Sequence, residues 1–186
     1  MTKGDIIQKI SNILSEKGHC IVAIDGTSAS GKTTLGEELH QRFSQSTLFH
    51  MDDYFLQPHQ RTKERLHEIG GNVDYERFYL EVISHLSDEG GFDTQRFDCQ
   101  TQTLNAPVHY TNAPLIIIEG AYSQHPYFGD VYDLRIVCEV TPSEQEQRII
   151  LRNGVEKWQR FVSEWIPKEQ DYLEHFHIKN KSELLQ

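Results

Sequence analysis

Residues 21–34 have the sequence IVAIDGTSASGKTT, an apolar run that ends at Gly26 and continues as the pattern G-x-x-x-x-G-K-T. This pattern is typical of a phosphate-binding loop between a strand and a helix. Gly26 and Gly31 allow backbone conformations in which consecutive N–H groups point at an anion. The helix that is expected to begin near Lys32 adds the positive end of its dipole. The stretch therefore predicts a binding site for a nucleoside triphosphate.

The loop residues have separate expected roles. Lys32 is predicted to reach the β- and γ-phosphates, and the Thr33 hydroxyl is predicted to ligate Mg²⁺. ATP and Mg²⁺ are accordingly the predicted cofactors. The alternative is a chance glycine-rich turn, which the strand before the loop and the helix after it disfavour. The residues predicted to surround the triphosphate are Gly26, Thr27, Ser28, Ala29, Ser30, Gly31, Lys32, Thr33 and Thr34.

Composition restricts the class of protein. The 186 residues, 37% of them apolar, fit one domain with a proper core. No apolar run is long enough to span a membrane, the N-terminal residues carry no signal-peptide pattern, and the three cysteines form no pairing motif. We therefore expect a cytoplasmic protein without a membrane partner. The net charge of −10 argues against nucleic acid as a partner but not against a mononucleotide. The ten histidines are interpreted as surface or packing residues.

Periodicity and turn residues predict strands that alternate with helices, which indicates an α/β domain with a mainly parallel sheet. Ligands bind such sheets at the carboxyl ends of the strands. We expect one domain over residues 1–186, with an N-terminal helix in 1–18 that packs on the sheet edge, a core in 19–178 and a polar tail in 179–186. The predicted strands are 19–25, 47–51, 115–120 and 133–140. The predicted helices are 2–17, 32–43, 74–86, 141–152 and 155–166, with a loop over 56–71 and loops with one hairpin over 92–114.

Charged residues follow the predicted strands. Glu119 ends a buried apolar run, as a carboxylate that supports Mg²⁺ does. Asp52 closes a short strand and could accept a proton from a substrate hydroxyl, but a turn aspartate is equally compatible with its position. Asp53 competes with Asp52 for this role. Arg148 and Arg152 lie four residues apart on one helix face, where they could cover the phosphates as a lid or belong to a solvated surface.

The motifs GTSASGKTT at 26–34, MDDYF at 51–55, NVD at 72–74 and EG at 119–120 resemble those of the uridine kinase / phosphoribulokinase family of P-loop kinases. Nicotinamide riboside kinases are similar in the DDYF segment. The resemblance covers about residues 19–176 and implies a five-stranded parallel sheet flanked by helices, with a mobile lid. It implies Asp52 as general base, Asp74 and Phe55 as acceptor-binding residues, Glu119 at the metal, and loosely Arg148 and Arg152 in the lid. Asp74 also stands where a helix N-cap is expected.

One segment departs from the family pattern. Gln102 stands near the position where the resemblance implies a histidine that contacts a uracil or cytosine ring, which disfavours uridine as the acceptor. We therefore expect a kinase that transfers the γ-phosphoryl group of ATP to a hydroxyl of a small molecule, a nucleoside or a vitamin-like compound.

Two other functions and the oligomeric state stay open. A non-catalytic ATP-binding regulator would carry the same loop. A kinase for nucleoside monophosphates would need further cations, for which Arg61, Lys63, Arg65 and Arg77 are candidates. A homo-oligomer is compatible with the sequence.

Overall fold

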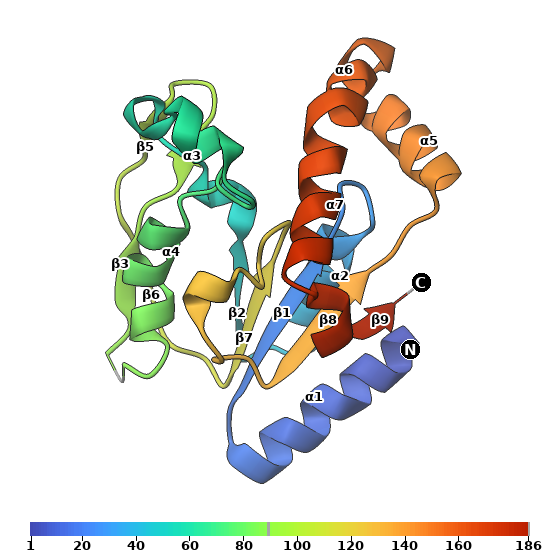
Figure 1. Ribbon diagram of the computed structural model, residues 1–186. Coiled ribbons are helices and arrows are strands. Elements are labelled where there is room, and N and C mark those ends of the chain that lie inside the picture. Colours follow the sequence, from blue (N-terminus) through green and yellow to red (C-terminus); the bar gives the residue numbers. More distant parts are fainter. Residues whose placement is uncertain (89, 186) are drawn as a thin grey trace.

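The computed structural model describes residues 1–88 and 90–185 and contains a five-stranded parallel sheet in the order β2-β7-β1-β8-β9 (Figure 1). This confirms the predicted α/β fold with its mainly parallel sheet. β1 and β7 are apolar and buried almost throughout, as strands with helices on both faces must be. The strands are β1 Cys20–Gly26, β2 Ser46–His50, β7 Leu115–Glu119, β8 Leu134–Cys138 and β9 Glu183–Leu185.

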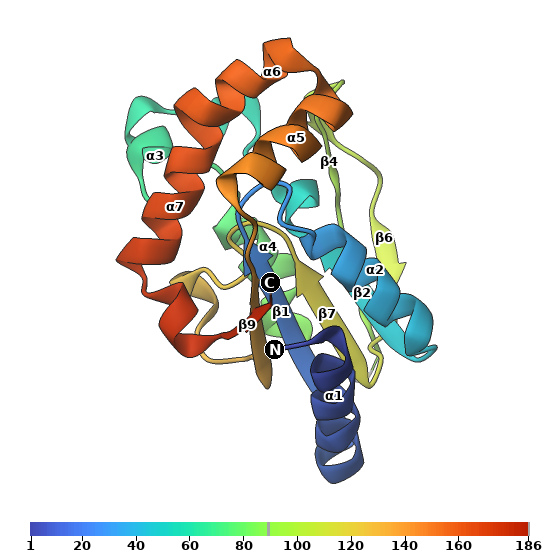
Figure 2. The ribbon, with the colours of Figure 1, turned by 90° about the vertical axis from the view of Figure 1, so that its right-hand side faces the viewer.

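Two helical layers cover the sheet. α1 (Lys3–Lys17) and α2 (Lys32–Arg42) lie on one face, and α4 (Tyr75–Glu81) and α7 (Ile166–His175) lie on the other (Figures 1 and 2). α1 begins at a reciprocal Thr2–Asp5 capping box and buries Ile6 and Ile10 against β1, β7 and β8. This helix was expected on the sheet edge, but its apolar stripe places it on a face beside α2.

Strand register brings the chemistry-bearing residues to one edge. Glu119 at the end of β7 is paired in register with Ile24 of β1 and with His50 of β2. The loop after β1 and the turn after β2 therefore leave the sheet beside Glu119. This is the carboxyl edge at which ligands of parallel α/β sheets bind.

The segment between β2 and β7 is built from short elements. The helix predicted over 74–86 ends earlier than expected, because Val82 leaves the helical conformation at φ −124° and ψ −63°. The predicted single hairpin is two nested antiparallel pairs, β3 with β6 and β4 with β5. The elements are η1 Met51–Tyr54, η2 Pro58–Gln60, α3 Lys63–His67, α4, η3 Ile83–His85, β3 Phe92–Thr94, β4 Phe97–Asp98, β5 Thr103–Leu104 and β6 Val108–Tyr110.

The C-terminal third contains the helices expected to form the lid. After η4 (Pro126–Phe128) and β8 come α5 (Pro142–Asn153), capped by Thr141, and α6 (Val155–Arg160). A π-helical segment, η5 (Phe161–Trp165), joins α6 to α7. The helix predicted over 155–166 therefore does not stop there: the helical run continues through Pro167 in the first turn of α7, directly after the π-helical segment.

The polar tail predicted for residues 179–186 is wrong for its described part. After η6 (Ile178–Lys181), β9 adds the fifth strand in parallel to β8. The Met1 amino group donates to the Leu184 carbonyl at 3.0 Å, and Lys9 pairs with Glu183. A three-residue edge strand has no periodicity that the sequence could display. In the described residues, no helix is both long enough and apolar enough to cross a membrane.

Candidate functional site

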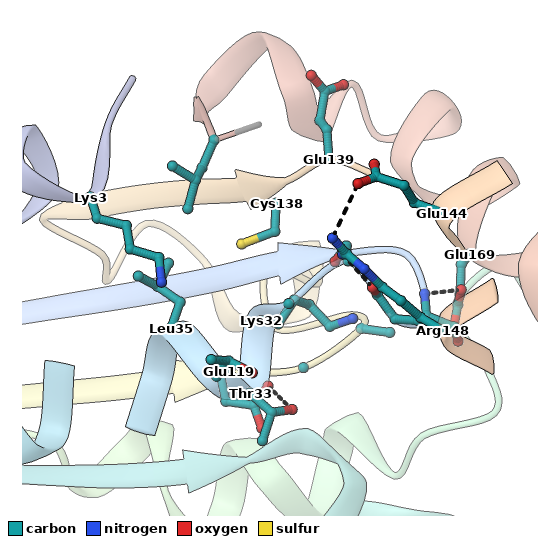
Figure 3. A pocket seen from close by; sticks show the side chains of 18 of the residues that line it. Lys3, Lys32, Thr33, Leu35, Glu119, Cys138, Glu139, Glu144, Arg148 and Glu169 are labelled. Carbon is teal, nitrogen blue, oxygen red and sulfur yellow. Dashed lines mark hydrogen bonds and ion pairs between the residues drawn. The ribbon is translucent and has the colours of Figure 1, made fainter. Parts of the chain in front are cut away.

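A cavity of about 740 Å³ lies at the carboxyl edge of the sheet (Figure 3). The loop after β1 and the start of α2 line it, together with residues of the N-terminus, of the strand ends and the turns that follow them, and of α5 and α7. The predicted residues that line it are Ser28, Ala29, Ser30, Gly31, Lys32, Thr33, Thr34, Asp52, Glu119, Arg148 and Arg152. Thr27 instead faces a second cavity of about 510 Å³ between α5 and α7.

The phosphate-binding loop has the conformation that its glycines predict. Gly26 has φ +138°, and a Cβ there would lie 2.3 Å from the Cys138 carbonyl oxygen. Gly31 has φ +98° at the start of α2. Ala29 is left-handed at φ +59°, and the buried Ser30 Oγ has no hydrogen-bond partner among the described residues. A backbone curled in this way, before a helix N-terminus, fits a polyphosphate anion.

Lys32 and Thr33 start α2 beneath the cavity. The buried Lys32 Nζ donates to the Thr27 carbonyl at 2.8 Å, so the cation is folded onto its own loop. The Thr33 hydroxyl donates to Glu119 Oε2 at 3.2 Å. A hydroxyl and a carboxylate that meet in this way are hard oxygen donors, which suits Mg²⁺. The two residues predicted to hold Mg²⁺, Thr33 and Glu119, are therefore in contact.

His50 is a site residue that the sequence analysis missed. Its Nδ1 lies 2.5 Å from Glu119 Oε1, and this hydrogen bond raises the pKa of His50 while its burial opposes the rise. The interpretation of the histidines as surface or packing residues did not anticipate this contact of His50 with Glu119. Only the register of β2 on β7 reveals the contact. Because His50 holds Oε1 of Glu119, it orients Oε2 toward the Thr33 hydroxyl.

Asp52 and Asp53 face different surroundings. Asp52 lines the cavity, and desolvation raises the pKa of its carboxyl, with Lys32 acting in the opposite direction. Asp53 pairs with Arg96 at 3.3 Å and is not among the described residues that line the cavity. Desolvation also raises the pKa of Asp53, and Arg96 opposes it. The geometry thus separates two neighbours that spacing left equivalent.

Asp74 is buried and engaged by the protein itself. Its carboxylate accepts from the backbone N–H of Arg77 at 3.1 Å, as the predicted N-cap does, and from Gln60 Nε2 at 2.8 Å. Arg77 Nε lies 3.4 Å from Asp74 Oδ2, the oxygen that accepts from Gln60. Phe55 pairs by an isolated bridge with Val73. Neither Asp74 nor Phe55 is among the described residues that line the cavity.

The two lid arginines lie at the cavity but contact the protein. Arg148 donates to the Ala29 carbonyl at 3.1 Å and lies 3.5 Å from Glu144. Arg152 donates to Asn153 Oδ1 at 2.9 Å. Both guanidinium groups therefore stand at the rim that a lid would close.

Two buried carboxylates beside the loop were also missed. Asp25 accepts from the N–H groups of Gly26, Tyr122 and Gln124 and from the Tyr172 hydroxyl at 2.7–3.2 Å. Glu169 of α7 lines the cavity and accepts twice from Ser28. The signals available were an acid directly before Gly26 and an acid on the apolar face of a helix.

Comparison with known proteins defines the class first. No model of a known protein family matches the chain. The solved structure of a possible uridine kinase from Bacillus stearothermophilus superposes with a TM-score of 0.71 over 98% of this chain and 100% of that chain, at 20% identity. A candidate fructose transport system kinase from Silicibacter sp. TM1040 gives 0.75 over 94% and 95%, at 22% identity. The fold is the α/β fold of the P-loop NTPases.

Sequence similarity then points to one group of these kinases. The uridine kinase of Ureaplasma urealyticum serovar 10 is 26% identical over 160 residues, which cover 81% of this chain and 76% of that protein. The resemblance to uridine kinase-like P-loop kinases that the motifs predict is thereby confirmed. The similarities support a kinase, and hence a phosphotransferase that uses a nucleotide.

Proposed function

We propose that the protein transfers the γ-phosphoryl group of ATP, with Mg²⁺, to a hydroxyl of a small molecule, a nucleoside or a vitamin-like acceptor. The observation that carries the proposal is the position of Asp52. Asp52 lines the same cavity as Lys32, the phosphate-binding loop and the Thr33–Glu119 pair. A base, a cation and a metal position around one space are the parts that phosphoryl transfer requires.

In the proposed reaction the acceptor O–H gives its proton to Asp52 as its oxygen attacks the γ-phosphorus. The bond from that phosphorus to the bridging oxygen breaks, and ADP leaves with the electron pair. A raised pKa makes the Asp52 carboxylate a better proton acceptor than an exposed aspartate. Lys32 and the loop N–H groups hold the charge of the phosphates. Thr33 and Glu119 would hold Mg²⁺, which supplies further charge neutralisation when it is bound.

Two observations favour a neutral acceptor over a nucleoside monophosphate. Arg65 is occupied by Glu76 and by the carbonyls of Gly71 and Val73. Arg61 donates twice to the Leu56 carbonyl. Arg77 pairs with Asp74 and donates to the backbone carbonyls of Asp53 and Gln95. Three of the four cations considered for a second phosphate are therefore already engaged.

Asp52→Asn tests the proposal most directly. We expect it to leave ADP affinity within about twofold and to lower transfer by about 100-fold or more, since a positioned base contributes 10²–10⁴. The assay is phosphoryl transfer from ATP with Mg²⁺ to nucleosides, nicotinamide riboside, pantothenate, sugars and nucleoside monophosphates. Asp53→Asn, the neighbour paired with Arg96, is the matched control and should keep near-full turnover.

Equal turnover by the Asp52→Asn variant would reject Asp52 as the base. If ATP binds but no acceptor is phosphorylated by the unaltered protein, the result favours a non-catalytic ATP-binding regulator, the second candidate function.

A further inference from the structure

Residues 27–29, which we call the outer half of the phosphate-binding loop, are contacted by side chains of two of the lid helices, α5 and α7. Gln145 Nε2 of α5 donates to Thr27 Oγ1 at 3.0 Å and to the Ser28 carbonyl at 2.7 Å. Glu169 of α7 accepts from Ser28 N at 2.7 Å and from Ser28 Oγ at 2.6 Å. Ser28 thus has its N–H, carbonyl and hydroxyl all bound by residues more than 115 positions away.

These contacts do not follow from the loop motif. The motif fixes Gly26, Gly31, Lys32 and Thr33, whereas residues 27–29 are its variable positions. They also lack the internal support of a helix or a strand. Ala29 lies in the left-handed region at φ +59°, a backbone conformation that residues other than glycine adopt at a cost in free energy. Contacts from outside the loop supply the support: Gln145 and Glu169 bind Thr27 and Ser28, and Arg148 of α5 donates to the Ala29 carbonyl.

Burial makes both side chains effective. Gln145 is 6% exposed and Glu169 is 7% exposed, so the loss of a partner would leave a largely buried polar group unpaired. The two donors of Ser28 satisfy both carboxylate oxygens, and an ionised carboxylate is the form that accepts from both. Desolvation raises the pKa of Glu169, while Lys32 and the Ser28 donors oppose that rise. A charge-assisted pair of this kind is among the stronger contacts available to a loop.

The two side chains also link the lid to the loop. α6 and α7 form one continuous helical run through the π-helical segment 161–165, and α5 lies beside the α6 end of this run (Figures 1 and 2). Figure 3 shows Glu169 and Arg148 converging on the loop from these helices. A displacement of α5 or α7 therefore acts directly on residues 27–29.

From these contacts we propose that Gln145 and Glu169 are positioning residues that form a lid clasp. The clasp sets the outer half of the phosphate-binding loop in its nucleotide-ready shape and couples that shape to the lid helices. This inference rests on the proposed function for its catalytic consequence. Its structural part, that the clasp orders the loop, stands apart from any reaction.

The first test is amide hydrogen exchange on the nucleotide-free full chain. Glu169→Ala should speed exchange of the peptide covering residues 26–34 about tenfold, because it removes two bonds to Ser28. Glu169→Gln keeps an accepting oxygen and an amide that can donate to Ser28 Oγ, so it should restore most of the protection. Glu164→Ala is the matched control, because Glu164 pairs with Arg160 and Lys168 on the same helical run. It should leave exchange of this peptide unchanged.

The second test is ADP affinity with Mg²⁺, measured by titration calorimetry. We expect Glu169→Ala and Gln145→Leu each to weaken ADP binding about fivefold to tenfold, since the loop must then be ordered on binding. The double variant should lose less than the product of the two, because both side chains act through Ser28. In the transfer assay the same variants should raise the KM for ATP more than they lower kcat.

Unchanged exchange and unchanged ADP affinity in Glu169→Ala and Gln145→Leu would overturn the clasp. If Glu169→Ala fails to fold, Ser28→Ala replaces it, since it removes only the hydroxyl contact and should give a smaller acceleration of exchange of the same peptide. A protein that phosphorylates no acceptor but shows the exchange pattern refutes the proposed function and keeps the clasp. A protein that phosphorylates an acceptor with unchanged exchange in the variants does the reverse.

Discussion

Two regions of the molecule are built differently: a phosphate half, residues 25–34 with their supporting side chains, and a proposed acceptor half, residues 51–110, of which Asp52 lines the cavity. In the phosphate half one strand runs through a loop into a helix within a dozen residues, and buried carboxylates hold the loop. In the acceptor half, short helices and two-residue or three-residue strands are joined by arginines that donate to backbone carbonyls. Arg61 binds the Leu56 carbonyl, Arg65 that of Gly71, and Arg77 that of Gln95.

This difference reflects two solutions to one problem, the pairing of backbone polar groups. The phosphate half leaves N–H groups at a helix start unpaired by the chain, so that they can bind an anion. The acceptor half satisfies carbonyls with side chains, so its shape depends on individual arginines rather than on a regular ladder. We expect the phosphate half to be sensitive to changes of charge and the acceptor half to tolerate them at positions other than Arg61, Arg65 and Arg77.

The largest expected effect is that of Lys32→Met. It removes the buried cation beside the Thr27 carbonyl, the same cation that lowers the pKa of Glu169. We expect transfer to fall about 100- to 1,000-fold, the usual loss when a group that stabilises transition-state charge is removed. Arg96→Met is the matched change in the acceptor half, where Arg96 is half-exposed beside Asp53. The Arg96→Met variant should keep its ADP affinity within about twofold. A loss of ADP affinity as large as the loss of transfer in Lys32→Met would contradict the contrast between the halves.

Asp25→Asn should give the largest loss of stability. Asp25 is 1% exposed and has four donors around it, so an amide NH₂ would face donors in place of an acceptor. We expect the free energy of unfolding to fall by about 2–4 kcal/mol. Asp53→Asn, at a partly exposed ion pair, should cost less than about 1 kcal/mol. Urea unfolding of both variants measures the difference, and equal losses would refute the contrast.

An acid-dependent loss of stability is expected where the acceptor half joins α7. His125 stacks on Tyr75 of α4 at 4.3 Å, and burial lowers its pKa to about 4. The unfolded chain binds this proton near pH 6.5, before the folded protein does. The stabilisation is therefore complete above pH 6.5 and is lost as the pH falls toward 4, by up to about 1.4 kcal/mol for each pH unit.

His125→Phe provides the reference for this pH dependence, because it keeps a stacking ring and removes the titrating group. The unfolding free energy of the unaltered protein minus that of the variant should decrease steadily from pH 7 to pH 5. A difference that does not change with pH would show that His125 is not held neutral.

The same contrast explains what the sequence could predict. Residues 26–34 act as a contiguous segment, so their spacing carries their structure, and Glu119 was found because it ends a buried apolar run. His50 and Glu169 escaped prediction because their roles depend on strand register and on helix docking. The helix predicted over 74–86 was too long because Ile83 packs on the core in a 3₁₀ turn as it would in a helix. β9 is an edge strand of only three residues and has no detectable period.

The smallest effect concerns two residues in the left-handed region, one in each half. Ala29 has φ +59° and Gln102 has φ +60°. Replacing either by glycine relieves about 1–2 kcal/mol of backbone strain. The added freedom of the unfolded chain offsets about 0.4–1 kcal/mol of this gain. For Gln102 the lost side-chain bond to the Cys99 carbonyl offsets about as much again. Both variants should therefore unfold within about 1 kcal/mol of the unaltered protein.

The Ala29→Gly and Gln102→Gly variants should differ in ADP affinity and in acceptor KM, although their stabilities are similar. Ala29→Gly loosens the segment that Gln145 and Glu169 hold, so it should weaken ADP binding about twofold to threefold and leave the acceptor KM alone. Gln102→Gly loosens the β4–β5 turn and should do the opposite, because that turn belongs to the acceptor half. Calorimetry with ADP and steady-state kinetics with the acceptor measure the two quantities on the same samples. If both variants moved both constants, the halves would be one mechanical unit, and the arginines of the acceptor half would have to transmit strain to the phosphate-binding loop.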